Sequence, residues 1–175
     1  MSSLKNNRIS KAYSIWGQFS DSEMNFFSNI KDIVNSNLKG PNFEIHITLT
    51  GPLLKYTSKT IQILKKISLE TKSFRLNVQN YNLSNEKYTA LFVKIKKSNK
   101  LIDLRKNLES KLKIRLSDYN PHISLYYGTE KKEKKIKVIK HLPKLPKKTI
   151  LKKICLVDYD ETIDKWKILK RFTLV

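Results

Sequence analysis

The sequence predicts an α+β protein with mostly antiparallel strands, organised as two related lobes of one domain. Two observations lead to this prediction. Segments with strand-like, period-two alternation follow amphipathic helical segments along the whole chain. In addition, a short histidine-containing pattern occurs once in each half of the chain, each time on a predicted strand.

The first half of the chain is predicted to alternate between strands and helices. A strand over Lys11–Phe19 has Tyr13, Ile15 and Phe19 on one face. Ser20 or Ser22 then caps a helix that ends at Gly40-Pro41, with apolar positions Phe26, Phe27, Ile30, Ile33, Val34 and Leu38. A second strand covers residues 43–50 and ends at Gly51-Pro52, and a second helix runs from near Ser58 to near Glu70, with Ile61, Leu64 and Ile67 facing inward.

The second half is predicted to contain five strands and one helix. Strands over 74–81 and 88–96 are joined by a turn at 82–86, and a helix capped by Ser98 carries Leu101, Leu104, Leu108 and Leu112. The remaining strands cover 122–127, 150–158 and 165–174. The charged run 131–140 is predicted to be a solvated loop or strand edge, with a phosphate-contacting strip as the alternative.

Composition indicates a globular chain in a reducing compartment. Its 175 residues are 39% hydrophobic, enough for one domain over residues 1–175, with residues 1–10 expected to be a flexible N-terminus. No segment approaches the roughly 20 apolar residues that cross a membrane, and the N-terminus has no signal-peptide pattern. The single Cys155 lies in an apolar run and is expected to be buried. A cytoplasmic location is therefore predicted.

The net charge of +21 permits two explanations. It fits an electrostatic surface for a polyanion, with RNA the first candidate. It also fits a codon bias, because the chain is rich in Lys, Asn and Ile. Charge alone does not separate a nucleic-acid binder from an enzyme.

The repeated pattern is His, apolar residue, hydroxyl residue, Leu. It occurs as His46-Ile47-Thr48-Leu49 and again, nearly half the chain later, as His122-Ile123-Ser124-Leu125. Because side chains alternate across a strand, each His shares a face with its hydroxyl residue, and the apolar residues face a core. Two such strands side by side offer two imidazoles and two hydroxyls to one small anion.

This set of groups suits hydrolysis of a phosphate ester. A neutral imidazole takes a proton from water, an imidazolium gives one to the leaving oxygen, and the hydroxyls donate to the other phosphate oxygens. No metal or cofactor is required, and close pairs of zinc ligands, glycine-rich phosphate loops and serine-hydrolase motifs do not occur in the sequence. His141 lacks a hydroxyl residue in this frame and is predicted to be a surface residue.

The two tetrapeptides resemble the mark of the two-histidine (2H) phosphoesterase superfamily. Within it the chain is most similar to the cyclic phosphodiesterase branch. That similarity rests on Ser14-Ile15-Trp16, on the run from Gly40 to Glu44 that leads into the first motif, on the second motif with its flanks from Pro121 to Gly128, and on Trp166 with Phe172-Thr173-Leu174. The resemblance implies a bilobal fold with pseudo-twofold symmetry, two antiparallel sheets flanking a central cleft, and helices outside.

The resemblance also implies roles for individual residues. His46 and His122 are then the acid/base pair, and Thr48 and Ser124 hold the phosphate. A cleft tyrosine is implied at Tyr127. Strict alternation instead places Tyr126 in the cleft, so Tyr127 requires a local twist or bulge. Trp16 either edges the cleft as a base-stacking surface or lies in the core.

The substrate remains open at this level. The resemblance implies opening of a 2′,3′-cyclic nucleotide, of ADP-ribose 1″,2″-cyclic phosphate or of a cyclic phosphate at an RNA end. The alternatives are a 2′,5′-oligonucleotide phosphodiesterase and a non-catalytic RNA-binding module on the same fold. The expected partner is thus a nucleotide or RNA end, with RNA contact through the basic surface, no membrane, and a monomeric protein.

Overall fold

A computed structural model describes residues 11–114, 118–160 and 162–175 of the chain. Residues 1–10, for which a flexible terminus was predicted, lie outside the described part. The elements in chain order are β1 (Lys11–Phe19), α1 (Asp21–Leu38), β2 (Ile47–Leu53), α2 (Ser58–Glu70), β3 (Phe74–Leu83), the 3₁₀ turn η1 (Lys87–Thr89), β4 (Leu91–Ile95), α3 (Asn99–Leu112), β5 (His122–Tyr126), α4 (Lys132–Ile139), β6 (Lys148–Asp160), the 3₁₀ turn η2 (Ile163–Lys165) and β7 (Lys167–Thr173).

The helices begin where their capping residues stand. Glu23 accepts a hydrogen bond from the backbone N–H of Ser20, the N-cap of α1. The hydroxyl of Ser98 accepts from the N–H of Leu101 at the start of α3. Such bonds satisfy backbone donors that the first helical turn leaves free. The predicted starts of these helices are confirmed.

The strands described form one seven-stranded antiparallel sheet in the order β1-β2-β5-β4-β3-β6-β7, in which β1 also pairs with β6. Two halves are recognisable within it. β5, β4 and β3 form one half, and β2, β1 and β7 belong to the other. The long strand β6 pairs with β3 near its start and with β1 and β7 further along, so it runs through both halves.

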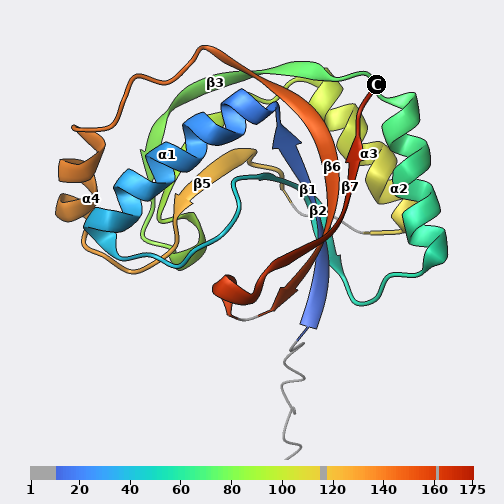
Figure 1. Ribbon diagram of the computed structural model, residues 1–175, viewed down its shortest axis with the longest axis horizontal. Helices are drawn as coiled ribbons and strands as arrows, with labels where there is room; N and C mark the ends of the chain where they lie inside the picture. Colours follow the sequence, from blue (N-terminus) through green and yellow to red (C-terminus); the bar gives the residue numbers. More distant parts are fainter. Residues whose placement is uncertain (1–10, 115–117, 161) are drawn as a thin grey trace, which may run out of the picture.

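Helices cover the two halves on the outside (Figure 1). α1 and α4 lie at one end of the molecule and α2 and α3 at the other, as the α+β prediction required. The core between helices and sheet is apolar and includes Phe19, Phe27, Leu64, Leu108 and Ile123, all without measurable exposure. In the described part of the chain, none of the helices is long and apolar enough to cross a membrane.

Four local predictions need correction. β2 starts at Ile47 rather than residue 43 and continues through Gly51-Pro52, which has a cis peptide bond. β4 starts at Leu91, because η1 precedes it. The run 131–140 forms helix α4 instead of a loop or strand edge. Ile33 lies on the outer flank of α1 and is 40% exposed, so it is not a core position.

Candidate active site

His46 and His122 are held in the same way. Nδ1 of His46 lies 2.7 Å from the carbonyl oxygen of Glu44, and Nδ1 of His122 lies 2.8 Å from that of Asn120. A carbonyl accepts only, so each Nδ1 carries a proton and donates it. In the neutral ring Nε2 is then the unprotonated nitrogen, which is ready to accept a proton.

The strands of the two histidines meet at one pair of residues. Ile47 of β2 is paired with Ile123 of β5, and the strands are antiparallel. That register places His46 across from Ser124 and Thr48 across from His122. The two tetrapeptides are thus related by a pseudo-twofold axis near this pair, which brings their four polar residues to the middle of the sheet.

A cavity of about 340 Å³ opens at this point. Both histidines line it, together with Thr48 and Tyr127. The other lining residues are Ser14, Trp16, Gly51, Pro52, Tyr88, Thr89, Tyr159 and Trp166. Among the lining residues described, none is Lys, Arg, Asp or Glu, so the cavity combines two imidazoles with hydroxyls and aromatic rings.

The two histidines differ in burial. His46 is only 4% exposed, and burial lowers its pKa to about 3, against the smaller raising effect of the Glu44 carbonyl and with His122 adding a further lowering. His122 is half-buried, and its pKa is also lowered by burial, opposed by its bond to the Asn120 carbonyl. In the ligand-free protein both rings are therefore biased toward the neutral form, and His46 more strongly.

A bulge in β5 determines which tyrosine faces the cavity. Ser124 pairs with Phe92 and Tyr126 pairs with Leu91, so β5 has an extra residue between two adjacent positions of β4. The alternation reverses after the bulge. Tyr127 lines the cavity and is 5% exposed, and Tyr126 packs in the main core.

Thr48 and Ser124 are not equivalent in the structure. Thr48 is exposed and lines the cavity. Ser124 is 3% exposed, is not among the lining residues described, and shares a side-chain hydrogen bond with Tyr127. Tyr127 thus lies between the second hydroxyl residue and the cavity. Burial raises the pKa of Tyr127, so its hydroxyl keeps its proton.

Trp16 packs against His46. Its ring is parallel to the imidazole, with 3.5 Å between centroids and an angle of 6° between planes, and Trp16 is 3% exposed. One face of the indole is therefore occupied by the imidazole, which favours the core alternative over the base-stacking alternative. Tyr88, at 52% exposure, offers a more accessible ring at the edge of the cavity.

Sequence reasoning missed several residues of the site. The sequence assigned Tyr88 and Trp166 to ordinary strands, and Tyr159 to the turn between the last two strands. The structure brings all three to the cavity, with the Tyr159 and Trp166 rings in edge contact at 5.7 Å. No local pattern marks them. Tyr88 lies in η1, Tyr159 near the end of β6 and Trp166 directly before β7, so their approach to the cavity depends on the whole sheet.

A polar network outside the cavity supports the Glu44 segment. Nη2 of Arg171 lies 2.9 and 2.7 Å from the two carboxylate oxygens of Glu44, and Nε2 of Gln18 donates to the same carboxylate at 3.1 Å. Nε of Arg171 donates to Oε1 of Gln18. Strands β7 and β1 are thereby tied to the residue whose carbonyl holds His46.

The other titratable candidates lie elsewhere. Cys155 is fully buried, and burial raises its thiol pKa to about 12. His141 is exposed and does not line the cavity. Within the described residues there is no group of three or more His, Cys, Asp or Glu side chains that could hold a metal ion.

Comparisons with known proteins find a family match in the sequence and a similar fold among solved structures. The sequence matches the family model of the 2′-5′ RNA ligase superfamily over residues 37–163. Among solved structures, LigT of E. coli in apo form has a TM-score of 0.63 at 13% identity, covering 94% of this chain and 98% of LigT. LigT complexed with 3′-AMP gives 0.59 at 15% identity, over 95% and 99% of the two chains.

A second solved structure gives the same TM-score as apo LigT. TT0787 of Thermus thermophilus has a TM-score of 0.63 at 12% identity, over 93% of this chain and 97% of that protein. No curated protein sequence matches the chain. The family match covers well over half of the chain and includes both histidine tetrapeptides. The chain therefore belongs to the 2′-5′ RNA ligase superfamily, the two-histidine phosphoesterases.

Proposed function

We propose that the protein is a metal-independent phosphodiesterase that hydrolyses a cyclic phosphate, either a 2′,3′-cyclic nucleotide, ADP-ribose 1″,2″-cyclic phosphate or the cyclic end of an RNA. One observation supports this most strongly. Two imidazoles line one small cavity, and each has its Nδ1 bonded to a carbonyl, so both Nε2 atoms remain for proton transfer.

The unequal burial favours one assignment of the acid and the base. His46 is the more buried ring and its pKa is the more strongly lowered, so it is neutral near pH 7 and serves as the base. Its Nε2 takes a proton from water while the water oxygen bonds to phosphorus. His122 is more accessible, and its Nε2–H gives a proton to the leaving oxygen as that P–O bond breaks.

Neutral donors complete the proposed site. The Thr48 hydroxyl lies in the cavity, next to His122 in the cross-strand register. The Tyr127 hydroxyl, bonded to Ser124, approaches from the other tetrapeptide. Hydrogen bonds from these groups stabilise negative charge on the non-bridging phosphate oxygens as the transition state forms.

The test is turnover of a 2′,3′-cyclic nucleotide by the wild type in EDTA, compared with folded His46→Gln and His122→Gln proteins. The wild type is expected to be active, and each variant to lose roughly 100-fold or more in kcat, the usual size of a positioned proton-transfer effect. Loss of activity in EDTA with rescue by a divalent ion contradicts the mechanism. RNA binding without turnover of any cyclic phosphate identifies a non-catalytic binding module instead.

A further inference from the structure

A tyrosine side chain ties the segment that leads into His122 to the neighbouring strand β2. The hydroxyl of Tyr119 donates to the backbone carbonyl of Thr48 at 3.2 Å. Tyr119 is next in the chain to Asn120, whose carbonyl holds Nδ1 of His122 at 2.8 Å. The same tyrosine therefore joins the backbone that orients one histidine to the strand that carries a hydroxyl of the active-site cavity.

Strand pairing gives this part of the sheet little support. β2 and β5 are joined by the single pair of Ile47 and Ile123. In that register Pro121 lies across from Leu49, and a proline has no N–H with which to extend the pairing. Both chains then line a second cavity of about 260 Å³. The Tyr119 side chain lines this cavity too, and it makes the contact to β2 that the proline cannot make.

The second cavity adjoins the active-site cavity. Thr48, Gly51 and His122 line both. Tyr119 lines the second cavity and is not among the described residues that line the first. Any effect of Tyr119 on the reaction therefore passes through Thr48 and His122, and not through contact with the substrate.

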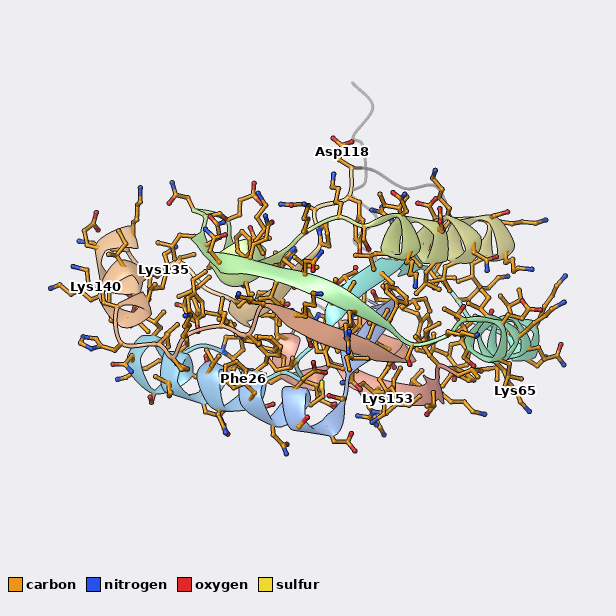
Figure 2. All side chains as sticks on the ribbon, turned by 90° about the horizontal axis from the view of Figure 1, so that it is seen from above. Phe26, Lys65, Asp118, Lys135, Lys140 and Lys153 are labelled. Carbon is orange, nitrogen blue, oxygen red and sulfur yellow. The ribbon has the colours of Figure 1, made fainter. Side chains whose placement is uncertain are left out.

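Arg105 of α3 holds the tyrosine ring. Its guanidinium carbon lies 4.0 Å from the centroid of the Tyr119 ring, as in a cation–π contact. Arg105 is only 7% exposed, and its Nε lies 3.4 Å from Oε1 of Glu109, one turn further along the helix. Burial raises the pKa of Tyr119 against the effect of the Arg105 charge, so the hydroxyl keeps the proton that it donates. Figure 2 shows Asp118, the residue before Tyr119, on the same side of the molecule as α3 and away from Phe26 of α1.

Resting on the proposed function, we infer that Tyr119 is a positioning residue, whose bond to the Thr48 carbonyl fixes the His122 imidazole relative to the Thr48 hydroxyl. Proton transfer to the leaving oxygen requires Nε2 of His122 within hydrogen-bond reach while the phosphate is held on Thr48. Without the Tyr119 bond, the segment before His122 gains freedom and the ring loses part of its fixed orientation. The carboxylate network of Glu44 gives His46 the corresponding support from different residues.

The test compares Tyr119→Phe with the matched control Tyr81→Phe. Each variant keeps the ring and removes one hydroxyl that donates to a backbone carbonyl, which for Tyr81 is that of Pro143 at 2.7 Å. Tyr81 lies on β3 and is not among the described residues that line either cavity. The two variants therefore lose the same kind of bond, and urea unfolding should show similar, small losses of stability.

Turnover of a 2′,3′-cyclic mononucleotide and the ¹⁵N spectra of the histidines are measured for the wild type and both variants. For Tyr119→Phe, we expect kcat to fall by roughly 2- to 10-fold, the range for loss of one neutral hydrogen bond, and KM to stay within about twofold. The spectrum of His122 should show some of the Nε2–H tautomer, and that of His46 should not change. Tyr81→Phe should match the wild type in kcat, in KM and in both histidine spectra.

The outcomes separate this inference from the proposed function. If the wild type turns over no cyclic phosphate, the proposed function fails. A changed His122 tautomer in Tyr119→Phe then still supports the orienting contact, and an unchanged one overturns it. If the wild type is active, equal kcat values for the two variants or an unchanged His122 spectrum in Tyr119→Phe overturns the inference alone. A raised KM at unchanged kcat also overturns it, because Tyr119 would then act on substrate binding.

Discussion

The two imidazoles of the cavity have different surroundings although their strands carry the same four-residue pattern. His46 is covered by the parallel ring of Trp16, and His122 meets the edge of Phe92 at 5.1 Å. His46 is buried against an aromatic face that excludes water, whereas the His122 ring is half-buried and stays partly accessible to water. A symmetric pair of motifs thus produces an asymmetric pair of proton-transfer groups.

This asymmetry predicts how the rate depends on pH. Burial lowers the pKa of both histidines in the free protein. His122 therefore loses its proton below pH 6.5, the pKa of a free imidazole, and kcat/KM should begin to decline at a pH below 6.5 as the pH is raised. In the complex the anionic phosphate favours the charged imidazole, and the kcat profile should lie at higher pH. Both profiles are measured with one cyclic nucleotide. A kcat/KM optimum above that of kcat contradicts the prediction.

The position of Trp16 predicts a split between kcat and KM. Trp16→Leu removes the ring that holds His46 and should lower kcat by roughly 2- to 10-fold, in line with aromatic pairs worth about 0.5–1.5 kcal/mol. KM should change little, because the indole face is taken by the imidazole. Tyr88→Leu is the comparison and should mainly raise KM. A Trp16→Leu protein with unchanged kcat and raised KM restores the base-stacking role.

Sequence could identify the histidines but not their neighbours. The repeated tetrapeptide is visible because both copies use the same short frame on a strand. The contact between Trp16 and His46 depends on how β1 lies beside β2, where Trp16 pairs with Thr48. Such cross-strand contacts follow from tertiary register, and one sequence does not specify that register.

At the scale of elements, the segment before β2 is held by its neighbours instead of by strand pairing. Glu44 uses its carbonyl to hold His46, and its carboxylate is bound by Arg171 on β7 and Gln18 on β1. This explains why the strand begins at Ile47 and not at residue 43. The apolar alternation of residues 43–50 correctly predicted burial, since Phe43 and Ile45 are both buried. It did not correctly predict strand pairing for residues 43–46, because β2 begins at Ile47.

Arg171 is therefore expected to position His46. Because Arg171 and Glu44 are both about half exposed, their ion pair is worth at most about 1 kcal/mol, and Arg171→Met should lower kcat by about fivefold or less. In the Arg171→Met protein, the ¹⁵N spectrum of His46 should show some of the Nε2–H tautomer. Arg171→Lys should restore part of the rate. Lys170→Met, an exposed neighbour on β7, is the control. An unchanged tautomer in Arg171→Met contradicts the positioning role.

The missed helix α4 has a physical explanation at the same scale. Its inward positions include Lys135, which is 2% exposed, alongside Val138. The amphipathic pattern of α4 is not recognisable when every lysine is assumed to be exposed to solvent, because one of its inward positions is a lysine. Its aliphatic part packs among neighbours and its ammonium bonds to the Ser84 carbonyl. The remaining helices, whose inward faces are formed mainly by Leu, Ile, Phe and Val, were predicted from the sequence.

At the scale of the molecule, the α+β class, the order of the main elements and the two-lobed symmetry followed from the sequence. The joining of both halves into one sheet did not. It depends on the length of β6, which pairs with β3 and β1 in turn, and on the single β2–β5 bridge between Ile47 and Ile123. Those pairings connect residues far apart in the chain, and they place both histidines where the two halves meet.

The buried histidines also predict how the stability of the whole protein depends on pH. The pKa of His46 is about 3 in the folded protein and about 6.5 in the unfolded chain, so between these values only the unfolded chain takes up the proton. The free energy of unfolding should therefore fall as pH is lowered from 6.5, with a slope of up to about 1.4 kcal/mol per pH unit from this group. Carboxylates titrate in the same range, so the comparison is made between variants.

Urea unfolding of the wild type, His46→Gln and His141→Gln between neutral and acidic pH isolates the His46 contribution. His46→Gln removes the buried titrating ring, so its stability should decline less steeply below pH 6.5 than that of the wild type. His141 is exposed, and His141→Gln should follow the wild-type curve. Parallel curves for the wild type and His46→Gln would show that His46 is protonated as readily in the folded protein as in the unfolded chain. The neutral base proposed for catalysis would then lose its physical support.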